Sequence, residues 1–200
     1  MKDKYILTAE SVTAGHPDKL CDTIADSVLD ACLKEDPNAR VACEVLATAG
    51  KILVAGELRT TASPDVEAIV RQTVRNAGYD CNYNVEVRLH TQSPDIAGAV
   101  DGDTLGAGDQ GIMYGYACWE TVELLPAPVV LANRITSLLT TCREENLISG
   151  MGPDGKAQVS VQYAFGVPER VDTIVISCQH DADKDPDELR EELRRLVIAR

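Results

Sequence analysis

The alternation of apolar and polar positions predicts a succession of helices and strands. Apolar residues recur at every fourth position from Leu20 to Cys32, which predicts a helix that opens at His16-Pro17-Asp18. A second apolar stripe follows Ser63-Pro64-Asp65, where Ser63 is expected to cap the helix, and stops at Gly78. The other helices expected from their spacing or start signals are Pro126 to Glu145 and a final helix from Asp185-Pro186.

Strands are predicted where short aliphatic runs lie between turn signals. They are Tyr5 to Leu7, Arg40 to Thr48, Ile52 to Thr60, Asn84 to Thr91, Met113 to Trp119, Lys156 to Phe165 and Arg170 to Gln179. Gly50-Lys51 is expected to turn the first hairpin, and Pro153-Asp154-Gly155 to form a turn ahead of the second. Residues 92–111 show no sustained periodicity, and a loop of that length is typical of a lid or binding loop, or else of a mobile segment.

The order helix, hairpin, helix occurs twice, and only its first occurrence is followed by a strand. This repeat predicts an α/β fold of the α+β type, built from helix–hairpin–helix–strand units with mixed sheets. We expect an N-terminal domain over residues 1–98, a lid and glycine-rich connection over 99–111, and a central domain over 112–200. The second unit lacks a closing strand and a helix stop signal, which predicts a truncated central domain; a helix that simply ends with the chain is the alternative.

Composition narrows the class of protein. The 200 residues carry a formal net charge of −13, which disfavours binding to nucleic acid or to an anionic membrane. No apolar run approaches the ~20 residues of a membrane span, and the N-terminal sequence lacks a signal-peptide core. The 7 cysteines are an odd number without metal-ligand spacing, which indicates reduced thiols in a cytoplasmic protein.

The densest polar cluster spans Glu10 to Lys19, between the first strand and the first helix. The N-terminus of a helix favours phosphate, and His16 and Lys19 can add hydrogen-bond donors. Asp18 or Glu10 can hold Mg²⁺ against phosphate oxygens. A plain capped helix, stabilised by proline and aspartate in its first turn, explains the same residues without any ligand.

Other candidate residues carry weaker signals. The sequence GAGDQG at 106–111 offers glycines for close backbone approach and Asp109 as a polar contact, or else forms a tight turn. Lys156 can reach a phosphate, although a lysine at a strand end is usually solvated. Glu44 and Glu57 interrupt apolar strands, where alternation permits both to face solvent. The histidines expected at the surface or at strand ends are His90 and His180.

Together these motifs resemble the first half of S-adenosylmethionine synthetase (methionine adenosyltransferase). The similar segments, in the order of the family, are TAESVTAGHPDKLCDTIADSVLDACLKEDPNARVACEV, TQSPDI, GAGDQGIMYGYA, LPAP and DGKAQV. The resemblance extends over essentially the whole chain and implies three similar α/β domains related by pseudo-threefold symmetry. It also implies an enzyme that forms S-adenosylmethionine from ATP and L-methionine, with release of phosphate and pyrophosphate.

The resemblance implies a role for each matching residue. His16 and Lys156 match catalytic residues at the triphosphate, Asp18 a Mg²⁺ ligand, and Glu44 a K⁺ ligand. The positions that match contacts to methionine or to the adenosine portion are Glu57, Gln92 and Asp109. Residues 92–105 match the mobile lid of the family, while Glu10 and Lys19 lie inside the first motif as further candidates.

Family members continue past this point with further glycine-rich and basic segments, and share active sites across a homodimer or a dimer of dimers. None of those segments is present, so we expect the 200 residues alone to be inactive or nearly so. Two other functions stay open. One is a short non-catalytic homologue that binds ATP or regulates a full-length subunit. The other is a Mg²⁺-dependent nucleotide phosphohydrolase that uses His16 and Asp18 without methionine.

Overall fold

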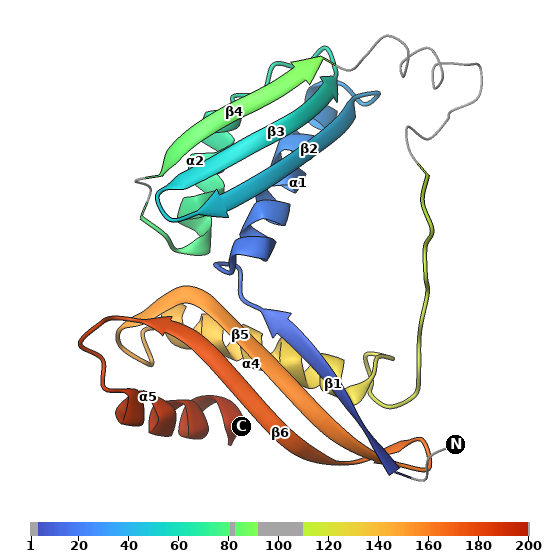
Figure 1. Cartoon of the computed structure of the whole chain (residues 1–200), viewed down its shortest axis with the longest axis vertical. Helices are drawn as coiled ribbons and strands as arrows, with labels where there is room; N and C mark the ends of the chain where they lie inside the picture. The colour runs from blue at the N-terminus through green and yellow to red at the C-terminus, as the bar shows by residue number, and fades with distance from the viewer. Residues whose placement is uncertain (1–3, 81–82, 92–109, 200) are drawn as a thin grey trace. The chain divides into compact units, whose positions relative to one another are not determined.

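The chain folds into two compact units, each with its own three-stranded sheet (Figure 1). The computed structural model describes residues 4–80, 83–91 and 110–199. The described residues of one unit are 4–19, 77–79 and 116–199, and those of the other are 20–76, 80, 83–91 and 110–115. Helices and strands are mixed in both units, which confirms the predicted fold class.

The first unit is built on a sheet in which all pairings are antiparallel. Its strands are β1 (Lys4–Val12), β5 (Met151–Ala164) and β6 (Val167–His180), in the order β1-β5-β6. Helix α4 (Ala127–Glu144), helix α5 (Pro186–Leu193) and the π-helical turn η1 (Arg194–Ile198) complete this unit. Its core contains Ile135 and Leu139 of α4, Val159 and Tyr163 of β5, and Leu189 of α5. Strand β1 therefore lies beside β5, which follows it by about 150 residues in the chain.

The second unit has a mixed sheet with β3 at its centre. Strands β2 (Arg40–Thr48) and β3 (Lys51–Arg59) form the predicted antiparallel hairpin, and β4 (Asn84–Thr91) pairs in parallel with β3. Helices α1 (Pro17–Glu35) and α2 (Val66–Ala77) lie along one face of this sheet (Figure 1). The stripe predicted from the sequence is confirmed, because the residues that α1 buries are Leu20, Ile24, Val28 and Cys32.

The capping residue of α2 differs from the prediction. The helix begins at Val66, and the carboxylate of Asp65 accepts a hydrogen bond from the amide of Ala68 at 3.0 Å. A cap must directly precede the first helical residue, so the expectation that Ser63 caps the helix is wrong. The start of α5 is as predicted, since Asp185 accepts hydrogen bonds from two backbone amides of the first turn.

The strand predicted over Met113 to Trp119 is absent. Residues 110–118 have no regular secondary structure, and Met113 and Tyr114 are 89% and 91% exposed. A strand is stabilised by ladder hydrogen bonds and by side chains packed on a face. Residues 113–119 have neither ladder hydrogen bonds nor side chains packed on a face. Their aliphatic and aromatic composition alone therefore does not make a strand.

The turn predicted at Pro153-Asp154-Gly155 lies instead within strand β5. The pairing of β5 with β6 shifts in register between Met151 and Gly155. Proline has no N–H to donate to a ladder, and a bulge is one of the few places where a strand accepts it. Lys156 is consequently an interior residue of a long strand, and not the first residue after a turn.

Candidate functional site

The loop between β1 and α1 is a tight turn that packs directly on β5. The amide of His16 donates to the carbonyl of Thr13 at 3.1 Å, which closes the turn. Thr13 in turn donates through its amide to Gly155 O at 2.9 Å and through its hydroxyl to Pro153 O at 2.7 Å. The polar cluster between strand and helix is therefore fixed to residues about 140 positions later in the chain.

Glycine is required at position 15 because the backbone of β5 approaches it closely. A Cβ atom on Gly15 would lie 2.4 Å from Pro153 O, a distance that no side chain tolerates. The approach at Gly155 is less close, since a Cβ there would lie 3.1 Å from the methyl group of Thr13. These two glycines allow the turn and the strand to meet without an intervening side chain.

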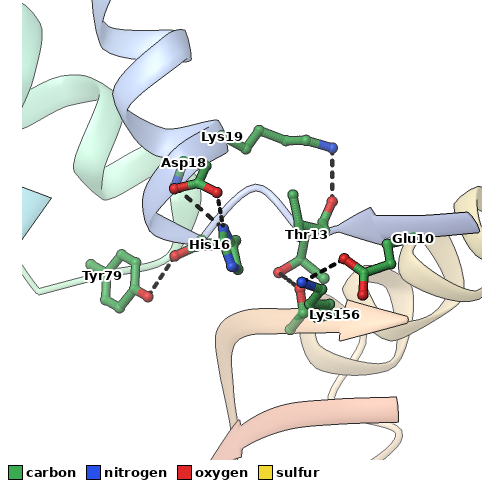
Figure 2. A network of polar contacts seen from close by, with 10 residues as sticks. Glu10, Thr13, His16, Asp18, Lys19, Tyr79 and Lys156 are labelled. Atoms are coloured by element: carbon green, nitrogen blue, oxygen red, sulfur yellow. Dashed lines mark hydrogen bonds and ion pairs between the residues drawn. The ribbon is translucent and has the colours of Figure 1, made fainter. Parts of the chain in front are cut away.

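His16 and Asp18 form a local pair at the start of α1 (Figure 2). The amide of Asp18 donates to His16 Nδ1 at 3.3 Å, while the Asp18 carboxylate lies 3.8 Å from the same nitrogen. The two contacts need opposite protonation states of Nδ1. The shorter contact is a hydrogen bond and the longer one is not, so we assign the neutral ring its proton on Nε2.

Lys156 meets Glu10 on the face of the sheet opposite to the buried core. Val12 pairs with Lys156 and Glu10 pairs with Gln158, so the side chains of Glu10 and Lys156 project from the same face. Lys156 Nζ lies 2.7 Å from a carboxylate oxygen of Glu10, and both side chains are about half exposed. Lys156 is thus held by a carboxylate, where the sequence suggested a solvated cation.

A pocket of about 270 Å³ joins His16 to Lys156. Its lining residues are His16, Asp154, Gly155, Lys156, Ser177, Cys178 and Gln179. Burial raises the pKa of the Cys178 thiol, so this cysteine stays protonated at neutral pH and is not an activated nucleophile. Larger cavities of about 740 and 680 Å³ flank α4 and α5, and among the described residues none of those predicted to be functional lines them.

Among the described residues, two of the predicted site residues lie in the second unit. Glu44 pairs with Ala55 and Glu57 pairs with Ala42, so both carboxylates project from the exposed face of the β2-β3-β4 sheet. His90 pairs with Glu57 and is exposed, and His180 ends strand β6 in an exposed position. The surface locations predicted for these two histidines are confirmed.

Some predicted residues lie outside the part of the chain that the structure describes. They are Gln92, Asp109, the lid over residues 92–105, and all of the 99–111 connection except Gln110 and Gly111. Lys19, a weaker candidate, is described: its ammonium group donates to Val12 O at 2.7 Å, at the end of β1.

Several uncharged residues that support the site are not marked by any sequence pattern. Thr13 and Gly15 lie inside the predicted motif, but nothing in their spacing indicates contact with β5. The hydroxyl of Tyr79 donates to Gly15 O at 2.7 Å (Figure 2). Tyr79 directly follows the predicted helix stop at Gly78, and no sequence motif marks it as part of the site. Asp154 lines the pocket, whereas its sequence pattern indicates only a turn.

Two kinds of feature are not found among residues 4–80, 83–91 and 110–199. No helix there is both long enough and apolar enough to span a membrane. No three histidine, cysteine, aspartate or glutamate side chains there are grouped closely enough to enclose a metal ion by themselves.

Comparison with known proteins identifies two domains of one family along the chain. Residues 4–102 match the N-terminal domain of S-adenosylmethionine synthetase, and residues 104–200 match its central domain. The chain is 47% identical over 208 positions to the S-adenosylmethionine synthase of a Nitratiruptor species, covering 99% of this chain and 54% of that protein. It is 46% identical over 212 positions to the protein of the same name from Prochlorococcus marinus (strain NATL2A), covering 97% and 52%. The chain spans about half the length of the curated relatives it matches.

Proposed function

Because the chain belongs to the S-adenosylmethionine synthetase family, we propose that it supplies the triphosphate-binding part of a methionine adenosyltransferase. The observation that carries this proposal is the pocket shared by His16 and Lys156, with Asp18 beside His16. In the proposed reaction the sulfur of L-methionine attacks C5′ of ATP, the C5′–O bond breaks, and the whole triphosphate leaves. The triphosphate is then hydrolysed to pyrophosphate and phosphate.

His16 and Lys156 are the proposed catalytic residues. Negative charge develops on the leaving oxygen, and donors fixed in place before the reaction stabilise it most effectively. We propose that the Nε2–H group of His16 donates toward this oxygen and that the Lys156 ammonium contacts the phosphates. Lys156 must then exchange the carboxylate of Glu10 for phosphate oxygens, so Glu10 keeps the ammonium at the pocket before ATP binds.

Mg²⁺ and K⁺ are the proposed cofactors. The Asp18 carboxylate is 88% exposed in the first turn of α1. A single carboxylate fits Mg²⁺, which commonly takes one or two carboxylates and completes its coordination with substrate phosphates and water. Mg²⁺ bound there would neutralise charge on the triphosphate, which an acidic protein needs. Glu44 is the proposed K⁺ ligand and supplies one exposed carboxylate.

The proposed contacts to methionine and adenosine lie elsewhere in the chain. Glu57 and Gln92 are proposed to bind methionine, and Asp109 to contact methionine and the adenosine portion of ATP. Residues 92–105 are proposed to cover the bound substrates. We further propose a cytoplasmic enzyme that assembles as a homodimer or a dimer of dimers with shared active sites.

We also propose that these 200 residues alone form little or no S-adenosylmethionine. The basic groups described at or beside the pocket are His16, Lys19 and Lys156, which are few for a triphosphate on a chain of net charge −13. Each missing charge-assisted contact would cost about 1.5–3 kcal/mol of transition-state stabilisation. Assaying S-adenosylmethionine formation by the purified chain tests this, and measurable turnover contradicts it.

Binding of Mg²⁺-tripolyphosphate tests the proposed site directly, without requiring turnover. Replacing Lys156 by alanine should weaken the affinity about 10- to 100-fold, because one charge-assisted contact is lost. Isothermal titration calorimetry measures the affinity. Lys4→Ala is the matched control, since Lys4 is also ion-paired on this sheet but lies at the far end of β1. Equal affinities of the Lys156→Ala and Lys4→Ala variants would contradict the site.

Assays of ATP binding and of hydrolysis separate the two alternative functions. A regulatory homologue should bind ATP without turnover and change the activity of a full-length S-adenosylmethionine synthase when the two are mixed. Hydrolysis of tripolyphosphate or ATP that needs no methionine would instead indicate a phosphohydrolase.

A further inference from the structure

Tyr79 reaches the His16 turn from the end of helix α2. The helix ends at Ala77, and Gly78 then adopts a positive φ of 100° that redirects the chain. A Cβ atom on Gly78 would lie 2.5 Å from a guanidinium nitrogen of Arg143, so the Arg143 side chain lies against this bend. The hydroxyl of Tyr79 donates to Gly15 O at 2.7 Å (Figure 2).

This hydrogen bond fixes one end of the peptide unit that precedes His16. The carbonyl of Gly15 and the amide of His16 belong to the same planar peptide and point in opposite directions. The amide donates to Thr13 O at 3.1 Å, and the carbonyl accepts from Tyr79 at 2.7 Å. Both polar groups of this peptide are therefore held, and its plane cannot rotate without breaking two hydrogen bonds.

The peptide needs this restraint because residue 15 is glycine. The approach of Pro153 O excludes a Cβ atom at this position, as described above. Glycine, however, restricts its own ψ angle less than any other residue does, so the orientation of the Gly15–His16 peptide depends more on its hydrogen bonds. A change in ψ of Gly15 that φ of His16 does not compensate redirects the Cα–Cβ bond of His16, which would move the imidazole relative to the pocket.

We propose that Tyr79 is a positioning residue for His16, acting through the Gly15–His16 peptide. The residues that line the pocket do not include Tyr79, so its effect on a ligand there is proposed to pass through this backbone contact. The expected effect on ligand binding rests on the proposed function of His16 at a triphosphate. The expected effect on the orientation of His16 is independent of that proposed function.

Removing the hydroxyl alone, with Tyr79→Phe, tests the proposal in the full 200-residue chain. The affinity for Mg²⁺-tripolyphosphate, measured by calorimetry, should fall about 3- to 10-fold, the range expected for one net hydrogen bond. The imidazole signals of His16 in two-dimensional NMR should shift or broaden. The chain has 3 histidines, so these signals are readily assigned with a His16→Gln variant. Tyr79→Met, which also lacks the hydroxyl, serves if Tyr79→Phe does not fold.

Tyr163→Phe is the matched control, because it removes a tyrosine hydroxyl that has only a structural role. Tyr163 is 1% exposed and donates to Glu120 at the other end of β5. Its removal should lower the melting temperature but leave the His16 signals and the affinity unchanged. If Tyr79→Phe behaves like Tyr163→Phe in all three measurements, the proposal is wrong.

A double-mutant cycle tests whether Tyr79 acts through His16. In a His16→Ala background, Tyr79→Phe should cause no further loss of affinity, and an undiminished loss would overturn the proposal. A wrong functional assignment would give a different result. If the unmodified chain binds no tripolyphosphate, the proposed triphosphate site is wrong. The NMR signals of His16 in the ligand-free Tyr79→Phe variant would still show whether Tyr79 positions His16.

Discussion

At the scale of single residues, the site depends on close backbone contacts more than on its charged groups. His16, Asp18 and Lys156 stand out in the sequence because their side chains carry recognisable chemistry. The contacts that place them involve Thr13, Gly15 and β5 backbone carbonyls. A glycine in a sequence does not indicate which backbone approaches it, so these contacts appear only in the folded chain.

Gly15→Ala tests the importance of this approach. The new Cβ would lie 2.4 Å from Pro153 O, so the turn or the strand must move. We expect a loss of about 1–3 kcal/mol in the free energy of unfolding, as for other overpacked sites, together with loss of tripolyphosphate binding. Urea denaturation and calorimetry measure the two effects.

The control for that variant is Gly115→Ala. A Cβ on Gly115 meets no atom within 4 Å, and its change in stability should stay within about 0.5 kcal/mol. Comparable stability of the two alanine variants would show that the close approach of β5 is unimportant.

At the scale of elements, register decides which side chains meet. The sequence predicts β1 and β5 as strands from their composition, but pairing of Val12 with Lys156 is a tertiary outcome. A shift of one residue in this register would move Lys156 away from Glu10 and toward the other face. The pairing of β5 with β6 is irregular between Met151 and Gly155, which accommodates Pro153 in the strand.

Asp36 provides a second connection between elements, from the end of α1 to the end of β3. Its carboxylate accepts hydrogen bonds from the amide of Thr61 at 2.8 Å and the hydroxyl of Thr60 at 3.0 Å. The bond from the Thr61 amide is the main reason why the pKa of Asp36 is lowered. A lowered carboxyl pKa stabilises the folded state above the unfolded pKa of about 4, and this contribution is lost as the pH falls through the folded value.

Asp36→Asn should therefore reduce stability at pH 7 and make no difference at strongly acidic pH. Urea denaturation between about pH 7 and pH 2 measures this dependence. Asp30→Asn, at an exposed position on the same helix, is the matched control and should leave the pH dependence unchanged. A penalty for Asp36→Asn that does not vary with pH would rule out the charge of Asp36 as its cause.

At the scale of the whole molecule, two units each bury a core of their own. In the β1-β5-β6 unit, Tyr163 stacks on Tyr5 with ring centroids 5.2 Å apart and donates to Glu120. Glu120 also accepts from the amide of Ala127, at the start of α4, at 2.9 Å. Burial, and then the bond to Glu120, raise the pKa of Tyr163 and keep it a donor at neutral pH.

Tyr163→Phe should consequently destabilise one unit and not the other. A lost buried hydrogen bond of about 1–2 kcal/mol corresponds to about 5- to 30-fold faster amide exchange through unfolding of that unit. Hydrogen exchange should accelerate in β1, β5 and α4 and stay unchanged in β2, β3 and β4. Tyr116→Phe, at a 73% exposed position, should change neither set. Equal acceleration in both units would show that the chain unfolds as a single cooperative body.

The sequence by itself determined the helices, most of the strands, the fold class and the candidate residues His16, Asp18 and Lys156. These follow from local rules, since the spacing from Leu20 to Cys32 and the start of α5 at Asp185 depend only on near neighbours. The structure alone decided that β1 joins β5 and β6, that residues 113–119 form no strand, and that Glu10 holds Lys156. It also decided that Tyr79 fixes the peptide before His16. Each of these outcomes depends on a partner far away in the chain, and no local pattern encodes which distant partner a strand or a hydroxyl will find.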